Sequence, residues 1–166
     1  MKIGGYIVKK LKVDMESLIE SFSLENLDLF KEYLDCSTGD VINVPTEVQK
    51  VVEGKGDIET LDEWMRDLIL EAERVNNDTE HRYIDIPMVE TKFIHSLMTD
   101  FTNEIIRNDK LEEKLRYTLN TENPMKNFKE VLRSSQSELD QWYNYEEEKT
   151  KEYVAAWLLK HDIELE

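Results

Sequence analysis

Apolar residues follow a helical spacing close to the start of the chain. Val13, Leu18 and Phe22 lie on one face of a helix. Asp14 can accept hydrogen bonds from the free N–H groups of the first turn, with Val13 and Leu18 at the two positions of a hydrophobic staple. The pattern therefore predicts a helix over residues 14–23.

From residue 27 onward the period changes to two, which is typical of strands. Apolar and polar side chains alternate over residues 30–36, and a second apolar run follows at Val41–Val44. Gly39 lies between the two runs and can supply the positive φ that a tight connection needs. These residues predict a β-hairpin.

A third alternating segment lies at residues 82–86, where Pro87 ends it because proline has no N–H to donate to a neighbouring strand. We expect one small antiparallel sheet that holds residues 29–44 and 82–86. Residues 3–8 are a candidate for a further strand of the same sheet.

The clearest apolar stripe of the chain lies between the strand regions. Residues 45–56, which contain two glycines, are predicted to be a loop, and one helix is expected after them. Its cap is either Asp57 or Thr60, the latter in a capping box with Glu63. The apolar stripe consists of Ile58, Leu61, Met65, Leu68, Ala72 and Val75.

Five carboxylates follow the opposite face of that predicted helix. Paired carboxylates can do acid and base chemistry or hold a divalent metal, but a row on one exposed helix face is usually just solvated. We favour the solvated face. The five residues are Glu59, Asp62, Glu63, Asp67 and Glu71.

The C-terminal half, residues 88–166, has helical periods only. Its last helix contains a stretch without apolar residues, 146–151, which predicts either solvated helical turns or a joint between two helices. The predicted helices cover the segments 93–105, 111–119, 123–132 and 137–161.

Length and composition indicate a single domain over residues 1–166. A chain of 166 residues with 40% hydrophobic side chains can bury one core, which argues against disorder, and no apolar run approaches the length of a membrane span. The expected fold class is α+β, with a small antiparallel sheet packed with helices and a helical C-terminal half. Residues 1–12 are either an edge strand or a mobile basic arm.

A lone Cys36 suits a reducing compartment, so we expect the protein to be located in the cytoplasm.

The formal net charge of −16 disfavours nucleic acid and anionic membranes as partners, because the field of the chain repels polyanions. Residues 107–133 interrupt this field with seven bases against five acids. They can form an anion or partner site, or pair with the chain's own carboxylates, which we favour. The candidate binding residues are Arg116, Lys126, Phe128, Lys129 and Arg133.

The sequence contains no recognisable catalytic or metal-binding constellation. Cys36 shares the alternation of Phe30 and Leu34, which favours a small buried hydrophobe over a reactive thiol. The three histidines are far apart in sequence, so we expect no zinc site, and His95 is expected to border the apolar core. We predict no cofactor, no metal and no catalytic residue.

The order of several segments resembles the bacterial uncharacterised protein family zero-one-five-eight. The segments that carry the resemblance are Val13–Glu20, Glu32–Val41, Arg82–Pro87, Met98–Phe101, Phe128–Leu132 and Ala155–Leu158, with Leu115, Leu119 and Trp142 between them. The resemblance implies no activity, substrate or cofactor. Residues 121–127 depart from the family, which tends to have a glycine-rich, arginine-bearing stretch there, and this weakens an anion site at that position.

Three functions remain from the sequence. The first is a non-enzymatic, acidic protein-interaction module with an unidentified protein partner, suggested by aromatic residues such as Trp64, Tyr143 and Tyr145 that lie off the apolar stripes. The alternative is a phospholigand or nucleic-acid binder that uses residues 107–133. The third is a hydrolase whose site the sequence does not reveal.

Overall fold

The computed structural model describes residues 2–3, 6–7, 9–22 and 29–166. The chain forms two compact units, one comprising Met1–Met88 with Ala156–Glu166 and the other Val89–Ala155. Helices and a small antiparallel sheet make the fold α+β, which confirms the predicted class. That residues 1–166 act as a single domain stays a prediction.

The sheet of the first unit has three antiparallel strands in the order β5-β4-β6. They are β4 (Phe30–Asp35), β5 (Val41–Pro45) and β6 (Tyr83–Asp85). In the register, Tyr33 of β4 lies opposite Ile42 of β5 and Asp85 of β6. The predicted hairpin and its third strand are confirmed.

Gly39 lies in the turn between β4 and β5, with a φ of 83°. Its carbonyl oxygen accepts a hydrogen bond from the N–H of Asp14, at 3.3 Å. A Cβ atom on Gly39 would lie 2.0 Å from the carbonyl oxygen of Lys12. The position therefore needs glycine both for its backbone conformation and for the close approach of another chain segment.

The first predicted helix, over residues 14–23, is confirmed as α1 (Met15–Ser21), and residue 23 lies outside the described residues. Asp14 caps it, because the Asp14 carboxylate accepts a hydrogen bond from the N–H of Ser17 at 3.2 Å. Phe22 directly after the helix is fully buried, and its ring meets that of Trp157 edge to face at a centroid distance of 5.2 Å. This contact joins the N-terminal and C-terminal segments of the first unit.

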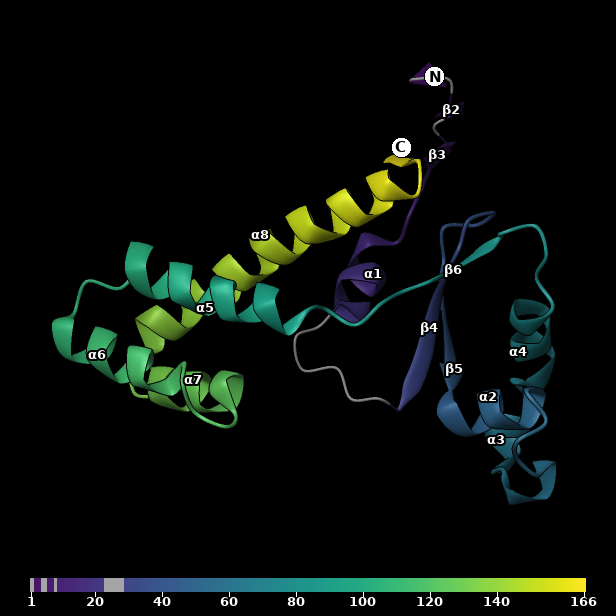
Figure 1. Cartoon of the computed structure of the whole chain (residues 1–166), viewed down its shortest axis with the longest axis horizontal. Helices are drawn as coiled ribbons and strands as arrows, with labels where there is room; N and C mark the ends of the chain where they lie inside the picture. Colours follow the sequence, from purple (N-terminus) through teal and green to yellow (C-terminus); the bar gives the residue numbers. More distant parts are fainter. Residues whose placement is uncertain (1, 4–5, 8, 23–28) are drawn as a thin grey trace. The chain divides into compact units, whose positions relative to one another are not determined.

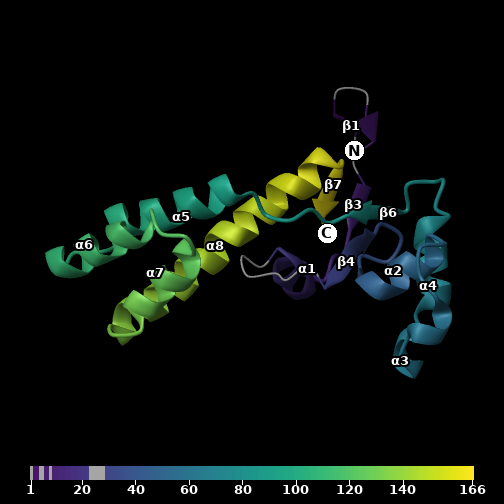
Figure 2. The same ribbon diagram turned by 60° about the horizontal axis from the view of Figure 1, so that its bottom comes forward.

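The ends of the chain pair in ways that the sequence pattern did not predict. β1 (Lys2–Ile3) and β2 (Tyr6–Ile7) are antiparallel to each other, whereas β3 (Lys9–Leu11) runs parallel to β7 (Ile163–Leu165) (Figure 2). The prediction that residues 3–8 join the three-stranded sheet is therefore wrong for the described part of that segment. Residues 4, 5 and 8 lie outside the described residues.

Two predictions between β5 and β6 are wrong. Residues 45–56 are not simply a loop, because α2 (Thr46–Val52) buries Val48 against one side of the sheet. The single helix expected from residue 58 is interrupted twice, which gives η1 (Ile58–Thr60), α3 (Glu63–Arg66) and α4 (Ile69–Asn76). These elements lie on the side of the sheet away from α1 (Figure 1).

The cap of this region is Asp57, whose carboxylate accepts a hydrogen bond from the N–H of Glu59 at 3.0 Å. The alternative capping box does not form, because the Thr60 hydroxyl donates to the carbonyl oxygen of Asp57 instead. Leu61 and Ala72 are buried in the core between the helices and the sheet. Part of the predicted stripe is therefore core, although Ile58 at its start is not.

The second unit is helical, as predicted. It contains α5 (Thr91–Glu104), α6 (Asp109–Thr118), α7 (Pro124–Leu132) and most of α8 (Gln136–Lys160). Phe101, Phe128 and Trp142 meet edge to face in its core, at centroid distances of 4.9–6.2 Å. α8 continues through residues 146–151, so the alternative of a joint there is wrong.

Among the described residues, no helix combines the length and apolar character that a membrane crossing requires.

Candidate functional site

Three large apolar side chains are exposed on the elements that follow α2. Ile58 on η1, Trp64 on α3 and Leu70 on α4 are 44%, 52% and 69% exposed. The same segment turns Leu61 and Ala72 into the core. The exposed side chains therefore contribute little to folding, and burying them would require a partner.

Carboxylates surround these side chains in the sequence. Residues 57–73 contain seven Asp and Glu and a single base, Arg66. The guanidinium of Arg66 donates to the carbonyl oxygens of Leu61 at 3.1 Å and Glu59 at 3.3 Å, so it is engaged within the segment. We call Ile58, Trp64, Leu70 and the carboxylates of residues 57–73 the acidic apolar surface.

The five carboxylates singled out from the sequence belong to this surface. Four of them, Glu59, Asp62, Glu63 and Asp67, are exposed, and Glu71 is half-buried. Asp62 and Asp67 flank the short helix α3. Within the described residues, no group of three or more His, Cys, Asp or Glu is arranged to hold a metal ion.

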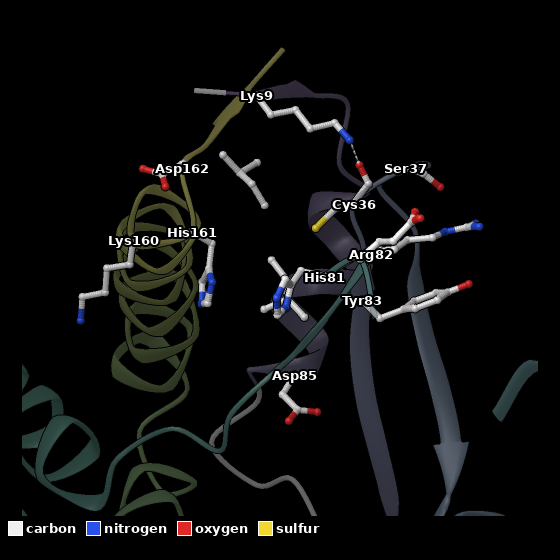
Figure 3. A pocket seen from close by; sticks show the side chains of 13 residues that line it. Lys9, Cys36, Ser37, His81, Arg82, Tyr83, Asp85, Lys160, His161 and Asp162 are labelled. Atoms are coloured by element: carbon white, nitrogen blue, oxygen red, sulfur yellow. Dashed lines mark hydrogen bonds between the residues drawn. The ribbon is translucent and has the colours of Figure 1, made fainter. Parts of the chain in front are cut away.

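A cavity of about 890 Å³ lies elsewhere in the first unit, where four chain segments meet (Figure 3). They are β3 at Lys9, the turn after β4 at Cys36 and Ser37, residues 80–85, and residues 160–163. The parallel pairing of β3 with β7 brings the last of these segments into place. A cavity of this size is in the range of small-molecule sites.

Beside the cavity, Asp35 and Arg82 form an ion pair with two hydrogen bonds, of 2.9 and 2.8 Å. The Asp35 carboxylate is almost fully buried and also accepts hydrogen bonds from the N–H and the hydroxyl of Ser37. The hydrogen bond from Arg82, helped by those from Ser37, holds the pKa of Asp35 well below its usual range. This pair joins the ends of β4 and β6 and keeps Asp35 charged.

Cys36 is half-buried rather than fully buried, and it lines the cavity. Burial raises the pKa of the Cys36 thiol, although the charge of Lys9 acts in the opposite direction. A protonated thiol is a poor nucleophile, so the site does not favour cysteine catalysis. His95 is exposed on α5, so the prediction that it borders the core is wrong.

The basic segment 107–133 lies in the second unit, and its candidate residues are engaged with their neighbours. Arg116 donates to Asn103 at 2.6 Å and forms an ion pair with Glu112. Arg133 pairs with Glu130 at 2.7 Å. These contacts agree with the interpretation that bases in this segment meet the chain's own carboxylates.

The other three candidates of this segment have different surroundings. The ammonium of Lys129 lies over the ring of Tyr143, at 5.8 Å from its centroid, and Lys126 is exposed. Phe128 is fully buried, so its ring serves the core of α5, α7 and α8. The anion or partner role of this segment stays a prediction.

A comparison with known protein families found one family that matches the chain. The sequence model of the Uncharacterised protein family (UPF0158) matches residues 8–166, nearly the whole chain. The chain belongs to this family. Comparisons with curated proteins and with solved structures gave no match. Membership in UPF0158 confirms the resemblance, and it assigns no activity to the residues described above.

Sequence reasoning found one part of the candidate surface and missed the cavity. Trp64 stood out because it lies off the apolar stripe, whereas Leu70 did not, because it lies between Leu68 and Ala72 of the stripe, two residues from each. The two histidines of the cavity, His81 and His161, are 80 residues apart in the sequence. No local pattern links them, because two long-range contacts bring them to one cavity: the pairing of β3 with β7, and the hydrogen bond from the N–H of Cys36 to the carbonyl oxygen of Arg82.

Proposed function

We propose that this UPF0158 protein is a non-enzymatic, acidic protein-interaction module. It binds a basic partner protein through the acidic apolar surface. The observation that carries the proposal is the exposure of Trp64 on α3 and Leu70 on α4, on one short segment with seven carboxylates and one engaged arginine. The single Cys36 of the chain suits work in the reducing cytoplasm.

The residue types of this surface suit protein binding. Tryptophan is enriched among the residues that dominate binding energy, because it buries a large area with few rotatable bonds. Carboxylates around such an anchor attract a basic partner over distance and disfavour acidic ones. The partner is therefore expected to offer apolar side chains flanked by Lys or Arg.

A defined probe tests the proposal. The probe is a synthetic amphipathic helical peptide with Leu on one face and Lys on the other, and calorimetry measures its dissociation constant. Truncating Trp64→Ala together with Leu70→Ala should weaken binding by about tenfold, equivalent to ~1.4 kcal/mol. The matched control is Leu159→Ala on α8, which removes a side chain that is 62% exposed outside this surface.

The control should bind the peptide like the unmodified protein. A second peptide, in which every Lys is replaced by Glu, should not bind, because like charges oppose its approach. Equal binding by the double variant and the unmodified protein would contradict the proposal. So would equal binding of the basic and acidic peptides.

The alternative function uses the basic segment 107–133 as a phospholigand or nucleic-acid site, and its support is the exposed Lys126 near the start of α7. The ion pairs of Arg116 with Glu112 and of Arg133 with Glu130 speak against this alternative, because these two bases already meet carboxylates of the chain. Heparin affinity at low salt tests it: the double change Lys126→Glu with Lys129→Glu should abolish binding if the segment is the site. We expect the unmodified protein not to bind heparin.

A hydrolase, the third function, has no group of described residues that favours it.

A further inference from the structure

Two histidines face each other across the cavity of the first unit. Figure 3 shows the ring of His161 directed into it from the end of α8, and the ring of His81 directed into it from the segment before β6. The sulfur of Cys36 points into the same space. Each imidazole can donate a hydrogen bond to a ligand in any protonation state.

Lys9 lies along the upper edge of this space, with its ammonium directed toward the carbonyl group of Cys36 (Figure 3). Its ammonium donates one hydrogen bond to the carbonyl oxygen of Cys36. An ammonium has three donors, so Lys9 retains further donors for a ligand. The cavity therefore combines a fixed positive charge with two imidazole donors.

Several other charged groups of the lining are directed away from the space between the histidines. Lys160 and Asp162 point away from the space between the histidines, and Asp85 lies at its lower end (Figure 3). Arg82 is turned to Asp35 by its two hydrogen bonds. Glu80 is the remaining carboxylate of the lining.

The backbone holds both walls in place. His81 and Asp162 have positive φ angles of 57° and 58°, a conformation that is uncommon for residues other than glycine. Hydrogen bonds fix the neighbouring backbone: the N–H of Cys36 donates to the carbonyl oxygen of Arg82 at 2.7 Å, and that of Lys9 to the carbonyl oxygen of Asp162 at 2.9 Å. A site formed before binding loses less entropy when a ligand enters.

We infer that this cavity binds a small organic anion, whose phosphate or carboxylate group meets Lys9 and the imidazoles of His81 and His161. The body of the ligand would lie against the apolar atoms of Ile84 and Ile163, which also line the cavity. This site is separate from the acidic apolar surface and does not depend on the function proposed for it.

Histidine NMR resonances provide the test, because the chain has three histidines and His95 lies outside the cavity. The ring signals are assigned with His81→Gln, His95→Gln and His161→Gln. Phenyl phosphate and benzoate are titrated separately, to distinguish the two head groups, with benzylamine as the cationic counterpart. At least one anion should shift the signals of His81 and His161 saturably, with a dissociation constant of about 1 mM or tighter.

Two lysine variants test whether the positive charge of Lys9 contributes to anion binding. Lys9→Gln should weaken the anion by about tenfold, whereas Lys160→Gln, which removes the same charge from a side chain that points away, should change binding less than twofold. Amide spectra check that both variants are folded. The inference is overturned if neither anion gives saturable shifts, if the His95 signal shifts equally, if benzylamine binds as well, or if the two lysine variants lose binding equally.

Discussion

The Arg82 guanidinium binds the Asp35 carboxylate with two hydrogen bonds, from Nε to Oδ1 at 2.9 Å and from Nη2 to Oδ2 at 2.8 Å. The pair spans the ends of β4 and β6, and Asp35 is the buried partner. Arg82 donates to both oxygens of the buried carboxylate, and Ser37 adds two further hydrogen bonds to Oδ1. The arrangement anchors the segment that contains His81.

This pair predicts a loss of stability in acid. The hydrogen bonds from Arg82 and Ser37 lower the pKa of Asp35 in the folded protein, below about 3.9 in the unfolded chain. A lowered folded-state pKa stabilises the protein fully above the unfolded value, and this contribution is lost as the pH falls from about 4 toward the folded value. Urea midpoints measured between pH 7 and pH 2 should therefore show Asp35→Asn less stable than the unmodified protein at neutral pH, with a difference that shrinks in acid.

The exposed Asp40, in the turn between β4 and β5, provides the control for this measurement. Asp40→Asn should show no such convergence. A difference between Asp35→Asn and the unmodified protein that stays constant from pH 7 to pH 2 would refute the role given to the Asp35 carboxylate.

Gly39 and Gly54 both have a positive φ, so comparing alanine variants at the two positions distinguishes the cost of backbone strain from the cost of steric overlap. Gly54 has a φ of 76° and open space where a Cβ would lie, whereas a Cβ on Gly39 would overlap the carbonyl oxygen of Lys12. Gly54→Ala should cost about 1–2 kcal/mol of unfolding free energy, from backbone strain alone. Gly39→Ala should cost about 3 kcal/mol or more, because overlap is added to strain. Equal losses in urea denaturation would show that Lys12 does not approach Gly39 closely.

The interrupted helices after α2 predict unequal roles for two members of one apolar stripe. Leu61 is buried against the sheet and α2, whereas Ile58 is 44% exposed. Leu61→Ala should lower the free energy of unfolding by about 2–5 kcal/mol. Ile58→Ala should change it by about 0.5 kcal/mol or less, as is usual at the surface. Similar losses for both variants would favour the continuous helix that the spacing alone predicts.

Local patterns predicted the elements whose signals are contained in one short segment. The alternation around Tyr33, the turn at Gly39 and the cap at Asp14 each depend on neighbouring residues, and the structure confirms them. α2 was missed, although Val48, Val51 and Val52 have helical spacing, because valine also favours strands and two glycines follow.

Features that depend on distant residues had no local signal. β7 has three residues and pairs with β3 near the opposite end of the chain. The stripe from Ile58 to Val75 kept its helical period across two interruptions, so its breaks at Asp62 and Asp67 were not visible in the spacing. Whether Trp64 and Leu70 were exposed likewise depended on which faces of the helices the sheet covers.

A comparison of two charge reversals tests the acidic apolar surface most directly, because it separates a local site from the net charge of −16. Asp67→Lys with Glu73→Lys reverses the carboxylates three residues before and after Leu70. Glu113→Lys with Glu148→Lys makes the same change in net charge at exposed positions of α6 and α8. Calorimetric titration with the basic amphipathic peptide should show binding about tenfold weaker for the first pair and changed less than twofold for the second. Equal weakening by both pairs would contradict the account, because net charge rather than this surface would then govern binding.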